Sequence, residues 1–182
     1  MHPLSNAIGL SVEWMQPKAL ARAYELSDGT RTFATLSFEK QFGSLGRAET
    51  TNGVFTMKRV GFFTTHITLR REGSDVDIAS YHPRWTGSAG ELRFPDGRLY
   101  QFKSANFWGT RHEVLDAQGR VLLALRSGVE DSHFSDIFKI QARLDLDTAL
   151  RDNRDLDQIV VLVWYIMLLH HQDAAAGAAV SS

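Results

Sequence analysis

Short runs in which apolar and polar residues alternate, separated by turn sequences, occupy most of the chain between residues 23 and 140. Alternation with a period of two places every second side chain on one face of a strand, so these runs predict half-buried strands. The runs are rich in Phe, Val, Thr, Tyr and Leu, which suit a pleated surface. The clearest same-face sets are Ala34, Leu36 and Phe38, then Tyr100 and Phe102, and then Val121, Leu123 and Leu125.

Turn sequences with a glycine, several of them Asp-Gly or Asn-Gly, separate the runs. Glycine adopts positive φ at low cost, which the tight turns of hairpins require. Successive turns lie roughly ten to twenty-five residues apart, which favours antiparallel meanders over strands joined by crossover helices. Most of the chain is therefore predicted to be β. The turns lie at Ser27–Thr30, Thr50–Gly53, Arg71–Asp75, Phe94–Gly97 and Asp116–Gly119.

The first 22 residues do not follow this pattern. The stretch NAIGLSVEWMQPKALARAYEL, which starts at Asn6, admits either a short strand or a short helix before Pro17. We expect residues 1–22 to form an N-terminal segment that packs on, or leads into, one domain spanning residues 23–173. No internal repeat and no linker divides that domain.

The C-terminal part of the chain predicts a helix from about Leu156 to His171. Asp155 is a candidate N-cap, and Gln158 three residues later gives the spacing of a capping box. Acidic residues at the start of this segment and histidines at its end also suit the helix dipole. The small residues that follow predict a flexible, alanine-rich tail over residues 174–182.

Ile159–Leu169 is a run of eleven consecutive apolar residues inside the predicted helix. A helix that spans a membrane needs about twenty apolar residues, whereas runs of about ten to fourteen are more typical of core helices. The run has no polar face, so the helix must be enclosed on every side. A sheet that curls around it buries the helix and removes the exposed edges of the sheet. The pattern therefore predicts a barrel of antiparallel strands with a helix through it, and a C-terminal membrane anchor is the alternative.

Four stretches carry a resemblance to known proteins: FGSLGRAE, GVFTMKRVGFF, ASYHPRWTG and LVWYIMLLHHQDAAA. With them, the chain from Tyr24 to Ala176 resembles the tubby C-terminal-like superfamily, in particular its branch of LURP-one-related proteins and phospholipid scramblases. The resemblance implies a mainly β fold, with about a dozen antiparallel strands around a central hydrophobic helix at the C-terminal end.

Composition and motifs exclude several function classes. The formal net charge of −1 argues against a protein that coats nucleic acid, and the absence of cysteine excludes disulfides and thiolate chemistry. No nucleophile elbow, P-loop or zinc-protease motif is present, so we predict a protein that is not an enzyme and has no cofactor. Two groups have ligand-type residues, but such scattered groups usually mark solvated loops, and no metal is predicted. They are Asp131, His133 and Asp136, and His170, His171 and Asp173.

The candidate binding residues are two basic pairs and one tryptophan. Tubby proteins hold phosphatidylinositol bisphosphate headgroups on a basic surface, so the resemblance implies an anionic headgroup or another phosphate ligand. Adjacent strand residues face opposite sides, so only one member of each pair can point outward into a shared patch. Trp85 could stack on a ligand, although a plug at one end of the barrel is the simpler interpretation. The basic candidates are Lys58, Arg59, Arg70 and Arg71.

These observations predict a non-enzymatic, tubby-like protein that binds anionic phospholipid headgroups or a phosphate ligand. Two alternatives remain: a module that binds another protein without lipid, and a protein anchored in a membrane by its C-terminal run. The N-terminus lacks a basic region followed by an apolar one, so a cytoplasmic protein, at most peripheral at the membrane, is expected.

Overall fold

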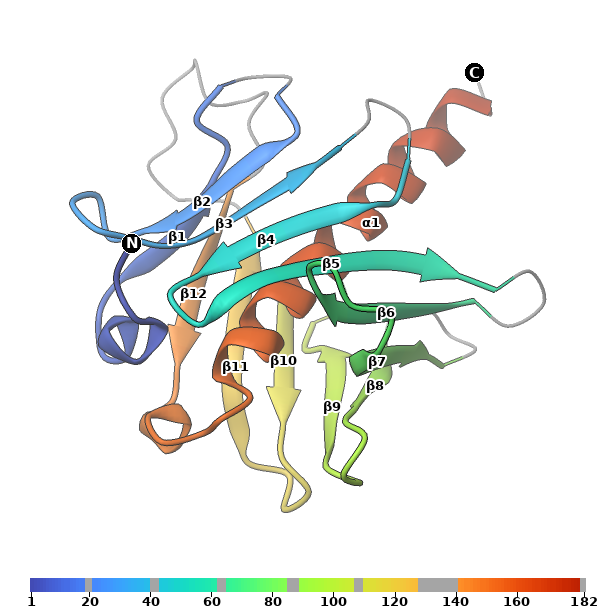
Figure 1. Ribbon diagram of the computed structural model, residues 1–182. Helices are drawn as coiled ribbons and strands as arrows, with labels where there is room; N and C mark the ends of the chain where they lie inside the picture. The colour runs from blue at the N-terminus through green and yellow to red at the C-terminus, as the bar shows by residue number, and fades with distance from the viewer. Residues whose placement is uncertain are drawn as a thin grey trace.

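The computed structural model describes residues 1–18, 21–39, 43–61, 65–84, 89–106, 110–127 and 141–180, with side chains as far as Gly177. These residues form a closed barrel of twelve antiparallel strands with one helix, α1, running through it (Figure 1). The predicted mainly β barrel with a C-terminal apolar helix is thereby confirmed. The strands are β1 (Val12–Met15), β2 (Ala23–Ser27), β3 (Thr32–Phe38), β4 (Gly46–Thr50), β5 (Gly53–Val60), β6 (His66–Arg71), β7 (Asp77–Pro83), β8 (Ala89–Arg93), β9 (Leu99–Ser104), β10 (Arg111–Leu115), β11 (Val121–Ser127) and β12 (Ala142–Leu146).

The first and last strands close the barrel. Every strand pairs with its neighbours in sequence, and β1 pairs with β12 through the register Val12↔Leu144 and Trp14↔Ala142. The N-terminal segment, residues 1–22, therefore supplies a strand of the barrel as well as the short 3-10 helix η1 (Leu4–Ala7). Between the two alternatives left open before Pro17, the structure has the strand.

The predicted strand faces lie toward the core in most places. Same-face sets in β3 and β9 are buried, as the alternation requires. In β11, Leu123 and Leu125 are buried as predicted, Val121 is partly exposed, and Leu122 and Ala124 on the opposite face are buried too. Each of the five predicted turns contains a glycine with positive φ: Gly29, Gly53, Gly73, Gly97 and Gly119.

Helix α1 (Leu156–Val180) is the core of the barrel. Every residue from Ile159 to Leu169 is at most 3% exposed, so the apolar run is enclosed on all sides. Trp164 stacks on Trp14 of β1 with 5.3 Å between ring centroids and an interplanar angle of 4°. A short 3-10 helix, η3 (Thr148–Leu150), precedes α1.

The helix is longer than predicted, because it continues to Val180 rather than ending near His171. Residues 174–177, expected to be a flexible tail, are helical and exposed, and Figure 1 shows the last turns of α1 emerging from the barrel. Alanine has the highest helix propensity, which favours extending an existing helix over fraying it. Small side chains alone predict a flexible tail, but the high helix propensity of alanine outweighs their small size here.

The predicted capping box at the start of α1 does not form. The Asp155 N–H donates to Asn153 Oδ1 at 2.8 Å, and the Asp155 carboxylate accepts from Tyr100 Oη at 3.0 Å and from Arg98. Gln158, in the orientation that satisfies both ends of its amide, donates to the Asp155 carbonyl at 3.2 Å. The Asp155 carboxylate therefore bonds to Tyr100 of β9 and to Arg98 just before that strand, rather than to its own helix.

By length and composition alone, Leu156–Gly177 is a helix that can cross a membrane, a test that the core helix of a soluble protein also passes. In this structure its apolar run lies inside the barrel. Apart from Ile166 and Leu169, which line a cavity at the barrel mouth, these side chains are reached by lipid only if the barrel opens.

Candidate functional site

A cavity of about 320 Å³ lies at the barrel mouth, where α1 leaves the strands. This volume is at the lower end of the range for small-molecule pockets, about 300–1,000 Å³. One wall belongs to α1, and the facing wall belongs to β5, β6 and β7. Its lining residues are Arg59, Thr65, His66, Ile67, Tyr81, Pro83, Ile166, Leu169, His170 and Asp173.

The helix wall is a single stripe of α1. Ile166, Leu169, His170 and Asp173 follow the three- and four-residue spacing of one helix face, and all four line the cavity. The stripe changes along its length from two apolar side chains inside the barrel to two polar ones at its exit. The cavity therefore has an apolar inner end and a polar rim.

The strand wall is one row of side chains across three strands. Arg59 of β5 lies opposite Ile67 of β6, and Ile67 lies opposite Tyr81 of β7. In β5 the positions of Phe55 and Met57 are buried, and Arg59 continues their face toward the interior. A guanidinium thus stands where alternation alone would place a third apolar side chain.

The Tyr81 hydroxyl is the most unusual group in this wall. Tyr81 is 1% exposed, and its hydroxyl has no hydrogen-bond partner among the described residues. A Cβ atom on Gly90 would lie 2.3 Å from the Tyr81 ring, so only glycine allows the ring to lie where it does. Burial raises the pKa of Tyr81 to about 12, so the hydroxyl stays protonated and can donate. A buried donor without an acceptor costs free energy, which a bound acceptor would recover.

Arg59 and Asp173 form a bidentate ion pair at the rim. Arg59 Nη1 donates to Asp173 Oδ1 at 3.0 Å and Nη2 to Oδ2 at 2.7 Å. The side chains of Arg59 and Asp173 are 33% and 57% exposed. The pair joins β5 to the part of α1 that lies outside the apolar run.

Three histidines gather beside the cavity on the side of β10. His112 is 6% exposed and stacks on Phe102 with 5.3 Å between centroids, and its centroid lies 6.5 Å from that of His170. Burial, followed by the charges of His170 and His171, lowers the pKa of His112 to about 4. Burial also lowers the pKa of His170, whereas the His171 side chain is exposed. The rings of His112 and His170 are therefore neutral at neutral pH, and Arg59 is the one arginine or lysine among the lining residues.

The structure separates the four predicted basic residues. Lys58 and Arg70 lie on the outer face and share a groove of about 290 Å³. Arg71 lies opposite Phe55 on the interior face, far along the barrel from Arg59, and donates to the Asn52 carbonyl at 3.0 Å. Lys58 and Arg70 thus point outward. Arg59 and Arg71 point inward, near different ends of the barrel.

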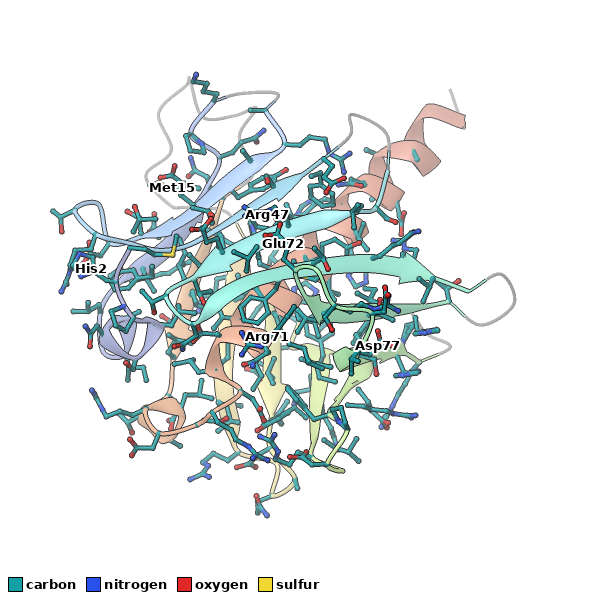
Figure 2. All side chains as sticks on the ribbon, in the orientation of Figure 1. His2, Met15, Arg47, Arg71, Glu72 and Asp77 are labelled. Atoms are coloured by element: carbon teal, nitrogen blue, oxygen red, sulfur yellow. The ribbon has the colours of Figure 1, made fainter. Side chains whose placement is uncertain are left out.

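Ion pairs neutralise much of the described outer surface. Arg70 Nε donates to Asp77 at 2.6 Å. Arg47 Nε donates to Glu72 at 2.7 Å, and both of these residues are labelled in Figure 2. Lys58 is exposed and forms no ion pair with any described residue. Among the described residues, the outer groove therefore has one cation without an ion-pair partner, in contrast to the basic surface that the resemblance implies.

Some predicted residues lie outside the described ranges. Trp85 is one of them, and so are Asp131, His133 and Asp136. Within the described ranges, no group of three or more His, Asp or Glu side chains is placed to hold a metal ion.

A hydroxyl–imidazole contact lies on the outside of β7. Ser80 Oγ and His82 Nε2 are 3.0 Å apart. Burial lowers the pKa of His82, with smaller contributions from Arg93 and His66, while Glu91 opposes them. Glu91 lies opposite His82 in the next strand, but its carboxylate accepts from Arg93 at 2.9 Å. The third group that would orient the imidazole in a catalytic triad is thus engaged elsewhere.

Sequence reasoning missed Tyr81 and the role of the helix stripe. The three- and four-residue spacing of Ile166, Leu169, His170 and Asp173 was visible in the sequence and would have shown one face that becomes polar. Tyr81 gave no such signal, because its unpartnered hydroxyl depends on the register of three strands.

No protein-family model, no curated protein and no solved structure matches this chain.

Proposed function

We propose that this chain is a non-enzymatic, tubby-like domain of the cytoplasm that binds an anionic amphiphile at the barrel mouth. The amphiphile is a molecule with an acidic head and an apolar tail, presented either by a membrane surface or free in solution. The observation that carries the proposal is the buried Tyr81 hydroxyl without a described partner, in the same row as Arg59.

The polarity of the cavity supports this ligand class. Ile67, Ile166 and Leu169 supply the apolar part of the lining, and Arg59 supplies a cation at the rim. A tail that displaces water from the apolar part gains roughly 25 cal/mol per Å² of apolar surface buried. An acidic head at Arg59 gains charge-assisted hydrogen bonds, about 1.5–3 kcal/mol each.

The volume limits the size of the inserted part. At about 30 Å³ for each water-sized group, 320 Å³ holds on the order of ten non-hydrogen atoms. That is enough for a short single chain, and too little for both chains of a membrane phospholipid. A membrane lipid would therefore bind with its head and the beginning of one chain.

Calorimetric titration tests the proposal with three probes of equal chain length: octanoate, octyl phosphate and octanol. We expect both anions to bind and octanol to bind at least tenfold more weakly, because it lacks the charge that Arg59 recognises. Arg59→Gln should weaken anion binding by tenfold or more, and Tyr81→Phe by about fivefold. Lys58→Gln is the matched control, since Lys58 is adjacent in β5 but faces outward.

Flotation distinguishes the two sources of ligand. Vesicles of phosphatidylcholine alone are compared with vesicles that also contain phosphatidylserine, at low and at physiological salt. Flotation only with phosphatidylserine, lost in Arg59→Gln, indicates a membrane lipid, and titration without flotation indicates a free amphiphile. If Lys58→Gln and Arg70→Gln abolish flotation while Arg59→Gln does not, the head binds the outer groove and the proposed site is wrong. If no anionic probe binds in either assay, the proposed function is wrong and a protein-binding role becomes the leading alternative.

A further inference from the structure

The carboxylate of Asp173 occupies the position on Arg59 that the acidic head of a ligand would take. Its two oxygens accept from Nη1 and Nη2 at 3.0 and 2.7 Å, the fork geometry by which arginine binds any planar carboxylate. Asp173 also lines the cavity, in the same helix stripe as Leu169 and His170. The protein therefore presents Arg59 already bound to a carboxylate of its own.

This ion pair is one that a ligand can displace. The Asp173 side chain is 57% exposed, so water takes its place readily when the pair opens. Exposed pairs of this kind contribute little to stability, because water competes for both partners. The Arg98–Asp155 pair at the other end of α1 differs, because the Asp155 side chain is only 4% exposed.

The charge of the cavity limits the ligand to a single negative charge. Arg59 is the cation of the lining, and His170 beside it is neutral at neutral pH because burial lowers its pKa. When a ligand displaces Asp173, that carboxylate stays close to the head, since it lies on the same rim. A dianionic phosphate head would meet one cation and one nearby carboxylate, whereas a carboxylate head would exchange with Asp173 charge for charge.

We infer that the barrel mouth binds a single-chain carboxylate whose head replaces Asp173 on Arg59, and that Asp173 is an internal competitor that sets the affinity. This inference rests on the proposed function and names its ligand class and its control. The tail lies along Ile166 and Leu169, and the Tyr81 hydroxyl is the second donor for the carboxylate head.

The experiment measures octanoate binding by calorimetric titration to the full chain and to Asp173→Asn. We expect Asp173→Asn to bind octanoate about three- to fivefold more tightly, because the competing carboxylate is gone. Asp77→Asn is the control, since it removes an equal charge from the comparable pair with Arg70 on the outer face and should leave the affinity unchanged. Octyl phosphate should bind the unaltered chain more weakly than octanoate does.

A double variant separates competition from a general effect of charge. If Asp173 acts through Arg59, adding Asp173→Asn to Arg59→Gln gives no gain in affinity. An equal gain in both backgrounds would show a general electrostatic effect and overturn the inference. Equal octanoate affinity in the unaltered chain and Asp173→Asn would also overturn it, while loss of binding in Arg59→Gln would leave the proposed function standing. Tighter binding of octyl phosphate would overturn the carboxylate class alone, and absence of binding to both anions would overturn the proposed function itself.

Discussion

Two tyrosine hydroxyls beside helix α1, one near its start and one where it leaves the barrel, differ in how they are satisfied. At the N-terminal end, the Asp155 carboxylate accepts from Tyr100 Oη at 3.0 Å and from Arg98, and Asn153 Nδ2 donates to Tyr100 Oη at 3.1 Å. Where α1 leaves the barrel, Tyr81 lines the cavity, and its buried hydroxyl has no partner among the described residues.

The difference between the two hydroxyls distinguishes polar groups that stabilise the fold from a polar group that is available to bind a ligand. Polar groups that hold a fold together satisfy one another, and a buried group that is left unsatisfied needs a separate explanation. Near the start of α1, Asp155, Tyr100 and Asn153 satisfy one another and fix where the helix begins, although Asp157 Oδ2 nearby has no described partner. At the barrel mouth, the Tyr81 hydroxyl is a buried donor for which the described residues supply no acceptor.

The largest expected loss of stability comes from placing a carboxylate in the enclosed middle of α1. Val163→Asp places a carboxylate in a position that is 0% exposed, and we expect it to lower the free energy of unfolding by at least about 4 kcal/mol. Ile166→Asp should cost less, about 2–3 kcal/mol, because Ile166 lines the cavity and water can reach the new carboxylate there. Urea unfolding followed by circular dichroism measures both. Equal losses would show that the cavity does not admit water, and a folded, fully stable Val163→Asp would contradict enclosure.

Lowering the pH should change the free energy of unfolding in opposite directions through His112 at the barrel mouth and Asp157 near the start of α1. His112 at the mouth has its pKa lowered to about 4, so the unfolded state binds more protons than the folded state between that pKa and the ordinary value of 6.5. Its contribution to stability is therefore present above pH 6.5 and is lost as the pH falls toward 4, up to about 3 kcal/mol. The pKa of Asp157 near the start of α1 is raised, chiefly by burial, so protonation of Asp157 stabilises the fold as the pH falls through that pKa.

Unfolding curves between neutral and acidic pH test this opposition. His112→Phe keeps a ring against Phe102 and should flatten the loss of stability in acid. Asp157→Asn should steepen that loss, because it removes the compensating group. A loss that is unchanged in His112→Phe would mean that another group controls the acid sensitivity.

The smallest expected effect compares two tyrosine hydroxyls. Tyr100→Phe removes bonds to Asp155 and Asn153, and we expect it to lower the free energy of unfolding by about 1–2 kcal/mol. Tyr81→Phe removes a hydroxyl with no described partner, so without ligand it should leave stability unchanged or raise it by up to about 1 kcal/mol. Thermal unfolding of the two variants, each 7% exposed or less at this position, gives the comparison directly. A destabilised Tyr81→Phe would show that the hydroxyl already has a partner.

The sequence was sufficient for the architecture because local patterns determine it. Alternation gave the strands, glycines gave the turns, and the lack of a polar face on Ile159–Leu169 required enclosure. The end of α1 was misplaced because the sequence offered two opposing signals, small side chains and high helix propensity. The capping box was wrong because Asp155 has a stronger partner, Arg98, that lies far away in sequence.

The site was harder to predict because it depends on register. The row of Arg59, Ile67 and Tyr81 exists only because β5, β6 and β7 pair with one particular offset. The four basic residues looked alike in sequence, and only the strand faces separate Arg59 at the mouth from Lys58 and Arg70 outside.

The position of α1 after all twelve strands has a consequence for synthesis of the protein. Translation proceeds from the N-terminus at about 5–20 residues per second, so every strand leaves the ribosome before the helix that fills the barrel. Until Leu169 has emerged, the inner faces of the strands have no helix to pack against. The barrel also closes only after β12 has been synthesised, because β12, more than a hundred residues after β1, is the strand with which β1 pairs. Such non-local pairing folds slowly, and the nascent chain is exposed to aggregation for that whole interval. A circular permutant that places α1 first would provide the core before the strands, and we expect it to fold with less need of chaperones.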